Sequence, residues 1–359
     1  MLRLAGIFLF LLLGPASCAR EVPVLGGSTM GTTYSVIVPE LAVSHQESLK
    51  RRVDLTLAKI NSALSTYQSD SSIADFNASV STDWMVVPGE FAVVADAAIQ
   101  IAADSGGAFD PTIAPLVELW GFGPEALSTE SPASPASPTS ALPTLASPTP
   151  ALPEASDISL LLQQSGYQFL QVDLVFSSVR KTKAALQLDL NAIAKGFAVD
   201  QLAQAVAEHG YVNYLIEIGG ELRVSGTNAK GEPWQIGIEH PRGNADGIAG
   251  LTLSDGGVAT SGDYRNAFVR DDVRYSHIID PRNGYPVSHS LASVTVVAKT
   301  TMIADAWATA LMVLGPVEGL KVAEQQGLAS YFILRAGEDF DTLSSSAFNQ
   351  LVRRNLSSN

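Results

Sequence analysis

The stretch Arg274-Tyr275-Ser276-His277-Ile278-Ile279-Asp280-Pro281-Arg282-Asn283-Gly284 has the pattern of a β-strand that runs into a tight turn. Because successive side chains of a strand point to opposite faces, Tyr275, His277 and Ile279 are expected on one face and Asp280 on the other. The proline and glycine that follow end the strand. A single histidine on a strand is more often an ordinary polar residue than a functional group, so the role of His277 depends on the rest of the chain.

Further strand-like segments lie on both sides of this stretch, and most of them follow one another with few helices between them. Strands are expected at residues 22–38 (interrupted by glycines), 168–174, 185–190, 214–218, 223–226, 234–239, 250–253, 258–261, 292–297 and 330–334. Helical patterns occupy residues 47–64, 91–103, 192–209 and 304–314. This order predicts an α+β fold with antiparallel sheets and flanking helices, rather than a doubly wound parallel sheet.

The overall composition excludes several classes of protein. With 359 residues, 46% of them hydrophobic, the chain is long enough for a large core in one domain or two. Its formal net charge of −14 argues against nucleic-acid binding. Cys18 is the only cysteine, which excludes an intrachain disulfide and a cysteine-rich zinc site. The histidines lack metal-ligand spacing, so a histidine-rich metal site is not expected.

Residues 1–18 have the features of a targeting segment. Arg3 supplies a positive charge, and residues 7–13 form an apolar run that is too short to cross a bilayer. Small residues then precede Cys18, as in a bacterial lipoprotein signal whose cysteine becomes the lipidated first residue. An ordinary secretory signal is the alternative. The segment predicts an exported protein, lipid-anchored to the bacterial cell membrane and facing the periplasm.

Residues 128–156 form a segment rich in Ser, Pro, Ala and Thr, with few aromatic or charged side chains. Such a segment cannot bury enough apolar surface to offset its chain entropy, which predicts a disordered surface insertion. A linker between two domains is the alternative. Because the flanking segments contribute to one site, we expect a single domain over residues 19–359 with this insertion inside it.

Asp305 and Thr309 are four residues apart on an expected helix and therefore project from one face. A carboxylate and a hydroxyl are hard oxygen ligands that suit Mg²⁺, which rarely has an all-protein cage. The neighbouring residues are apolar, so this helix is expected to be buried, and a buried Asp needs a partner. A solvated Asp and a Thr bonded to its own helix are the alternative.

Two further segments have the pattern of ligand sites. Residues 189–196 join a strand to a helix whose first turn has free N–H groups and carries Lys195, an arrangement that favours anions. A simple helix cap with an exposed lysine explains the same residues. Residues 217–221 place two glycines between two carboxylates, which permits close approach of a ligand but equally a plain hairpin turn.

Eight short motifs occur in order along the chain. They are Thr-Met-Gly-Thr at 29–32, Leu-Ser-Thr-Tyr at 64–67, Gly-Ala-Phe-Asp-Pro-Thr at 107–112, Asp-Leu-Asn-Ala-Ile-Ala-Lys-Gly at 189–196, Ile-Gly-Gly at 218–220, Ala-Thr-Ser-Gly at 259–262, Ser-His-Ile-Ile-Asp-Pro at 276–281 and Ala-Asp-Ala at 304–306. Together they resemble the FAD:protein FMN transferases, the ApbE family, over about residues 22–335. The insertion at 128–156 is longer and richer in proline than the usual connection in this family.

This resemblance implies a single α+β domain related to the T-fold and a defined reaction. Members of the family use Mg²⁺ to split FAD, attach FMN through its phosphate to a Thr of a partner flavoprotein, and release AMP. The partner would be a flavoprotein subunit of a membrane redox complex. The residues that match the family's FAD contacts are Met30, Tyr67, Ala108, Phe109, Asp110, Asp189, Lys195 and Ile279. Those that match its metal ligands are Asp305, Thr309 and the backbone carbonyl of Ala192.

The proposed reaction needs a base, because a Thr hydroxyl is a weak nucleophile at neutral pH. His277 is our candidate, with Asp280 or Asp263 as an orienting or alternative group. Two other functions use the same residues. One is a Mg²⁺-dependent FAD pyrophosphatase that yields FMN and AMP, and the other is a flavin-binding lipoprotein without catalysis.

Overall fold

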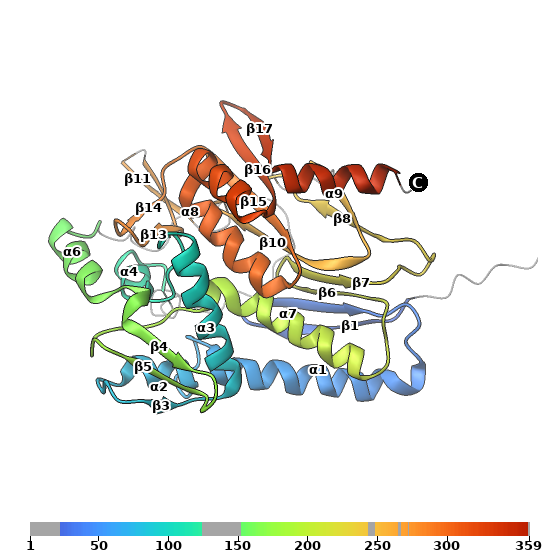
Figure 1. The fold of residues 1–359 in the computed structure, drawn as a ribbon, viewed down its shortest axis with the longest axis horizontal. Coiled ribbons are helices and arrows are strands. Elements are labelled where there is room, and N and C mark those ends of the chain that lie inside the picture. Colours follow the sequence, from blue (N-terminus) through green and yellow to red (C-terminus); the bar gives the residue numbers. More distant parts are fainter. Residues whose placement is uncertain (1–21, 124–151, 243–247, 265–266, 272, 358–359) are drawn as a thin grey trace, which may run out of the picture.

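A computed structural model describes residues 22–123, 152–242, 248–264, 267–271 and 273–357 (Figure 1). Its centre is an eight-stranded sheet in which every neighbouring pair is antiparallel. In sheet order the strands are β1 (Val24–Thr29), β2 (Thr32–Ile37), β6 (Tyr214–Ile218), β7 (Glu221–Ser225), β10 (Asp255–Gly262), β15 (Leu291–Ala298), β16 (Ala329–Ala336) and β17 (Asp339–Ser344). The predicted α+β class with antiparallel sheets is confirmed.

Four long helices pack together beside this sheet. They are α1 (Val43–Leu64), α3 (Gly89–Asp104), α7 (Asn191–Glu208) and α8 (Thr301–Gln326). Helix α7 contacts both α1 and α8, and α8 packs on β10 and β15 (Figure 1). Neighbouring residues on β16 point to opposite faces, so Phe332 joins the helical core and Ile333 joins a second apolar cluster. That second cluster lies under the hairpin β8 (Trp234–Ile238) and β9 (Ala249–Leu253) and under α9 (Ser346–Ser357).

Smaller elements complete the fold. A three-stranded sheet consists of β3 (Met85–Val86), β5 (Ser178–Lys181) and β4 (Leu170–Asp173). In the chain, α2 (Ser72–Ala78) precedes β3, and the short helix η1 (Tyr167–Phe169) precedes β4. Helices α4 (Ala114–Leu119) and α6 (Ala155–Gln164) contact each other. Two short pairs, β11 (Ala267–Arg270) with β12 (Val273–Ser276) and β13 (Ile279–Asp280) with β14 (Tyr285–Pro286), flank the segment around His277.

The strand expected at 185–190 is wrong. Leu186, Leu188 and Leu190 are buried, which explains the strand-like alternation, but their backbone groups do not enter a ladder. The side chain of Asn77 accepts from the Leu188 N–H at 2.7 Å and donates to its carbonyl at 2.9 Å. The Leu186 carbonyl accepts from Lys181 Nζ at 2.8 Å. Side chains therefore satisfy backbone hydrogen-bonding groups of this extended segment, which the hydrophobic pattern alone cannot distinguish from a strand.

The strand expected at 275–280 is interrupted. β12 ends at Ser276 and β13 begins at Ile279, because the Ser276 hydroxyl accepts from the Ile278 N–H at 3.1 Å. A side chain that takes a local backbone donor competes with the strand ladder. We expected His277 and Asp280 on opposite faces of one continuous strand, and that continuous strand is not present.

Helix α8 extends beyond its expected end at residue 314. Gly315 has φ 73° and ψ −176°, which is not helical, and Pro316 follows. The chain therefore breaks where glycine and proline predicted it, but a second helical segment continues to Gln326. By length and composition α8 is the one described helix that could cross a membrane. However, 67% of its most apolar stretch is buried inside the protein, so it serves as a core helix.

The described residues reach only the edge of the expected insertion. Ala155 and Ser156 form the first turn of α6, so the expected disorder is wrong at those two positions. The rest of the insertion up to residue 151 lies outside the described residues, as do the expected signal segment and Cys18.

Candidate active site

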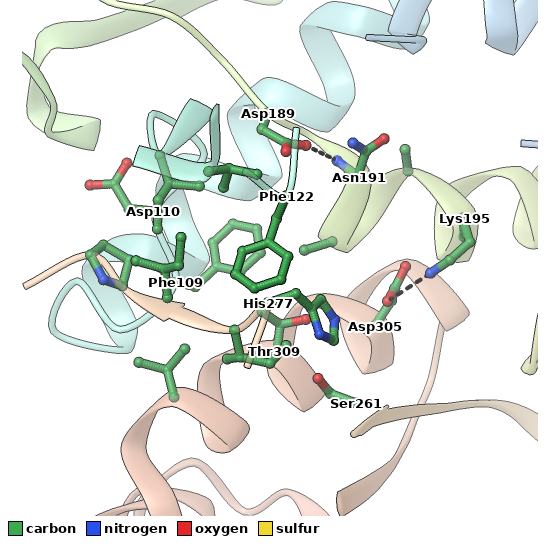
Figure 2. A pocket seen from close by; sticks show the side chains of 18 of the residues that line it. Phe109, Asp110, Phe122, Asp189, Asn191, Lys195, Ser261, His277, Asp305 and Thr309 are labelled. Carbon is green, nitrogen blue, oxygen red and sulfur yellow. Dashed lines mark hydrogen bonds and ion pairs between the residues drawn. The ribbon is translucent and has the colours of Figure 1, made fainter. Parts of the chain in front are cut away.

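A cavity of about 390 Å³ opens where the β1–β2 turn, the start of α7, the end of β10 and the first half of α8 meet. Figure 2 shows that its side chains come from segments spread over most of the described chain. The predicted ligand residues that line it are Met30, Tyr67, Ala108, Phe109, Asp110, Asp189, Ala192, Lys195, His277, Ile279, Asp305 and Thr309. The fold thus gathers these positions from distant parts of the chain around one cavity.

Met30 enters the cavity from the two-residue turn between β1 and β2. Met30 and Gly31 have φ values of 50° and 71°, so both adopt the left-handed conformation that tight hairpins require. A non-glycine residue in this region is strained, and such strain gathers at functional sites. The turn therefore places the Met30 side chain at the cavity wall at some cost in local stability.

Asp110 and Asp189 form a rigid polar wall. Asp110 Oδ1 accepts from the N–H and the hydroxyl of Thr112 at 2.8 and 2.7 Å, and its Oδ2 accepts from the Tyr167 N–H at 3.0 Å. Asp189 Oδ1 accepts from the Asn191 N–H at 2.8 Å. Burial raises the pKa of both carboxyl groups, and these hydrogen bonds oppose the rise. Their geometry is fixed before any ligand binds.

Asp305 faces α7 across the closest approach of two helices. Its Oδ2 accepts from the Gly196 N–H at 2.9 Å, and its Oδ1 lies 4.0 Å from Lys195 Nζ (Figure 2). Burial raises the pKa of Asp305, while the Lys195 ammonium and the Gly196 N–H oppose this rise. The helix that holds Asp305 is fixed at its start, where Asp200 accepts from the N–H groups of Thr301 and Met302 at 2.9 Å each.

Glu221 stands behind Lys195 and was not predicted as a site residue. Its Oε1 accepts from Lys195 Nζ at 3.0 Å, and its Oε2 has no hydrogen-bond partner among the described residues. Burial raises the pKa of Glu221 to about 7, with a smaller contribution from Asp305 and an opposing one from Lys195. The sequence signal was the pair of glycines before it, which permits the tight turn into β7.

Asp305, Thr309 and the Ala192 carbonyl fit a magnesium ion. They offer a carboxylate, a hydroxyl and a carbonyl, all hard oxygen donors, on one wall of the cavity. Lys195 Nζ lies 4.0 Å from Asp305 Oδ1, which is beyond hydrogen-bond distance, so the ammonium does not make a direct hydrogen bond to this oxygen. Within the described ranges no three His, Cys, Asp or Glu side chains form a group that could hold a metal ion.

His277 lies in the bend between β12 and β13, where it lines the cavity together with Ile278 and Ile279. Phe122 meets its ring edge to face, with the ring centroids 6.3 Å apart, and also lines the cavity (Figure 2). The bend is what allows three consecutive residues to face one space, since a regular strand would turn one of them away. Sequence reasoning did not select Phe122.

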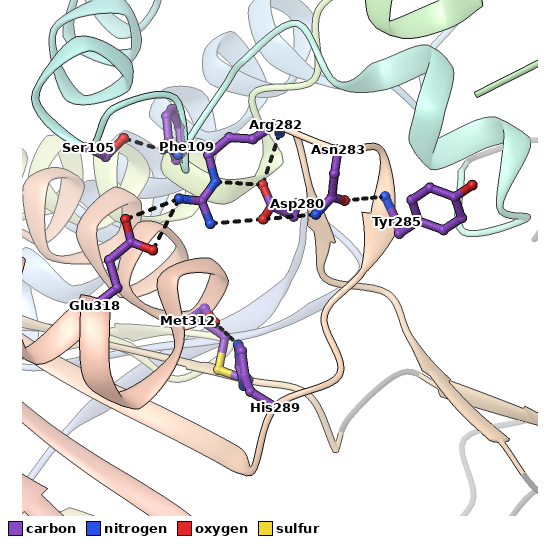
Figure 3. A network of polar contacts seen from close by, with 9 residues as sticks. All are labelled: Ser105, Phe109, Asp280, Arg282, Asn283, Tyr285, His289, Met312 and Glu318. Carbon is purple, nitrogen blue, oxygen red and sulfur yellow. Dashed lines mark hydrogen bonds and ion pairs between the residues drawn. The ribbon is translucent and has the colours of Figure 1, made fainter. Parts of the chain in front are cut away.

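Asp280 and Asp263 are committed to other partners. Asp280 is not among the described residues that line the cavity, and both of its oxygens accept from Arg282 at 2.9 Å (Figure 3). Asp263 is buried and ion-paired with Arg274 and Arg335 at 2.8 and 2.9 Å. Of these three residues, His277 lines the cavity and the two carboxylates do not. A catalytic role of Asp280 stays a prediction.

The chain is similar to known proteins over most of its length. Residues 30–332 match the model of the ApbE family. The FAD:protein FMN transferase of Haemophilus influenzae is 37% identical over 351 residues, covering 94% of this chain and 94% of the relative. The flavinyl transferase ApbE of Pseudomonas stutzeri superposes with a TM-score of 0.78 at 40% identity, covering 92% and 96%. The flavin transferase ApbE of Vibrio cholerae gives 0.77 at 35% identity, covering 92% and 99%.

Proposed function

The chain belongs to the ApbE family, and from this membership we propose that it is a Mg²⁺-dependent FAD:protein FMN transferase. The observation that carries the proposal is the convergence on one cavity of Lys195, His277 and the oxygen donors around Asp305. In the proposed reaction, the hydroxyl oxygen of an acceptor Thr forms a bond to the FMN phosphorus of FAD. The pyrophosphate P–O bond to AMP breaks, and AMP leaves with the bonding electrons.

Asp305, Thr309 and the Ala192 carbonyl would hold the magnesium ion, which when bound supplies charge neutralisation at the phosphate oxygens. Lys195 reaches the cavity from the second turn of α7 and places an ammonium beside the same wall. A cation positioned beside the phosphate groups stabilises the negative charge that develops during phosphoryl transfer. Lys195 therefore supports departure of AMP.

We infer that His277 accepts the proton of the acceptor Thr. It is the one histidine among the described residues that line the cavity, and histidine is the side chain that most often acts as a general base in enzymes. The ring of Phe122 packs edge to face against it. The same residues support a hydrolase if water replaces the Thr, so the acceptor decides between transfer and hydrolysis.

We also infer that the protein is exported and lipid-anchored through Cys18, and that its acceptor is a flavoprotein subunit of a membrane redox complex. Residues 1–18 have the lipoprotein signal pattern that supports the first inference. The second follows from the first, because an exported transferase can reach only acceptor domains that lie outside the cytoplasm.

One incubation tests the proposed function against its alternatives. The purified protein is mixed with FAD and Mg²⁺, with and without a candidate flavoprotein subunit. A mass increase of the subunit by one FMN, together with free AMP, supports the transferase. Free FMN and AMP in equal amounts with no modified subunit identify a pyrophosphatase. Unchanged FAD in every mixture identifies a flavin-binding protein without catalysis.

A further inference from the structure

Glu221 is a buried carboxylate that the proposed reaction does not use directly. It is 4% exposed, and it is not among the described residues that line the cavity. Its contact with the site is a single ion pair, from Glu221 Oε1 to Lys195 Nζ at 3.0 Å. A buried carboxylate with one oxygen unpaired is costly to maintain, so its presence behind Lys195 needs an explanation.

Lys195 stands between two carboxylates and is closer to one of them. Its Nζ lies 3.0 Å from Glu221 and 4.0 Å from Asp305 Oδ1, so it makes a hydrogen bond to the first and only a longer electrostatic contact with the second. The lysine side chain is 30% exposed, whereas both carboxylate side chains are nearly inaccessible. The ammonium is the movable member of this group of three charges.

Both carboxylates are attached to one rigid frame. Leu222, the residue after Glu221, accepts from the Thr301 hydroxyl at 3.0 Å through its carbonyl. Thr301 lies in the first turn of α8, one turn before Asp305. The separation of Glu221 and Asp305 is therefore set by a direct β7–α8 contact, and Lys195 is held at its position by the nearer of the two.

This arrangement resolves a conflict between two cations. An ammonium attracted by Asp305 would occupy the space that a metal ion needs and would repel that ion as a like charge. We propose that Glu221 is a positioning residue that holds the Lys195 ammonium away from Asp305 and keeps this carboxylate open to a divalent cation. The inference rests on the metal ligands of the proposed function and adds a residue that acts on them through Lys195.

Magnesium binding measured by calorimetry on the full-length protein without FAD tests this role independently of activity. We expect Glu221→Gln to bind Mg²⁺ about tenfold more weakly than the wild type, within the range of coupling between residues in contact. Lys195→Met should bind at least as tightly as the wild type. The double variant Glu221→Gln/Lys195→Met should recover the affinity that Glu221→Gln lost, because the competing ammonium is gone.

Two further variants control for structural effects. Glu217 lies on β6 of the same hairpin. Its neighbour Ile218 pairs with Glu221, so Glu217 points to the opposite face of the sheet from Glu221. Glu217→Gln therefore changes a carboxylate on that opposite face. It should bind Mg²⁺ like the wild type. Glu221→Asp keeps the charge and should lose less affinity than Glu221→Gln. Thermal unfolding of each variant shows whether it is folded, and Lys195→Met carries the test if Glu221→Gln does not fold.

The possible failures are distinct. Equal Mg²⁺ affinity in wild type and Glu221→Gln overturns the inference and leaves the metal site intact. A double variant as weak as Glu221→Gln also overturns it, because Glu221 would then act without Lys195. If the single variant Lys195→Met binds Mg²⁺ more weakly than the wild type, the inference is also overturned, because the ammonium would then not compete with the metal ion. A wild type that does not bind Mg²⁺, while still transferring flavin, overturns the metal ligands themselves.

Discussion

The backbone of Gly196 touches the side chain of Asp305 directly, with the Gly196 N–H donating to Asp305 Oδ2 at 2.9 Å. A Cβ atom on Gly196 would lie 2.8 Å from Asp305 Cβ and 2.4 Å from the Thr301 carbonyl oxygen. Real Cβ atoms do not approach other atoms this closely, so α7 and α8 can meet here only because residue 196 has no side chain. This contact sets the distance between Lys195 on α7 and the side of the cavity formed by Asp305 and Thr309 on α8.

Gly196→Ala should therefore separate the two helices. Overpacking of this kind costs about 1–3 kcal/mol of unfolding free energy, and the separation should also weaken Mg²⁺ binding. Urea unfolding and Mg²⁺ titration measure the two effects. Gly237→Ala is the matched control, because a Cβ there meets no atom within 4 Å and should change stability by less than about 0.5 kcal/mol. Equal stability of the two variants would contradict the close contact.

Asp305→Asn should abolish Mg²⁺-dependent flavin transfer. The amide keeps the size of the side chain but removes the charge that a metal ion needs. Since burial disfavours the charged form of Asp305, the neutral variant should be at least as stable to heat as the wild type in the absence of metal. Transfer rate against Mg²⁺ concentration, together with thermal unfolding, checks both statements. A wild-type magnesium curve would refute the assignment of Asp305 as a ligand.

His277→Ala should slow flavin transfer by about 10²–10⁴-fold, the usual contribution of a general base. FAD binding should persist, because the other lining residues are unchanged. Single-turnover transfer and FAD fluorescence separate the two quantities. His240→Ala is the control, since His240 packs edge to face on Phe340 and is not among the described lining residues. If His277→Ala transfers flavin at the wild-type rate, another group is the base.

His289 should make the protein less stable in mild acid. Burial lowers its pKa from the ordinary value of 6.5, while Nε2 stays bonded to the Met312 carbonyl at 2.9 Å and the nearby Asp263 charge opposes the shift. Below about pH 6.5 the unfolded chain therefore binds a proton that the folded chain does not, and the unfolding free energy falls as the pH falls. His289→Gln keeps a donor for Met312 but cannot be protonated.

The comparison of these two proteins isolates this contribution. Urea unfolding at pH 7.5 and 5.5 should show a larger loss for the wild type than for His289→Gln. Glu221, whose pKa is raised to about 7, acts in the opposite direction, since the folded chain keeps its proton longer. It is present in both proteins and cancels. The same pH dependence in both would show that His289 does not titrate on unfolding.

The residues of the site were more predictable than its geometry. Asp305 and Thr309 could be placed on one helix face because helical spacing is local, and the helix exists as expected. The position of His277 could not, because the Ser276 hydroxyl interrupts the strand through a contact that competes with the ladder. The glycines at 219 and 220 marked the segment around Glu221, but they did not reveal its role, which depends on the tertiary contact with Lys195.

The same distinction applies to the fold. Helices α1, α3 and α7 were expected within a few residues of their observed bounds, because their apolar faces repeat locally. The segment that contains Leu188 was misassigned because Asn77, more than a hundred residues away, supplies the hydrogen bonds of its backbone. Long-range side-chain contacts leave no pattern in the sequence around either residue.

The site is distributed along the chain from Met30 in the first hairpin to Thr309 in α8. Because Thr309 is residue 309 of 359, a ribosome must complete about six-sevenths of the protein before both side-chain ligands proposed for magnesium exist. No amino-terminal fragment that stops before α8 can carry the activity, and complementation by two separate halves requires the helix contact at Gly196 to form between chains. The proposed chemistry is therefore complete only after α8 has been made, when six of the eight strands of the central sheet are already in the chain.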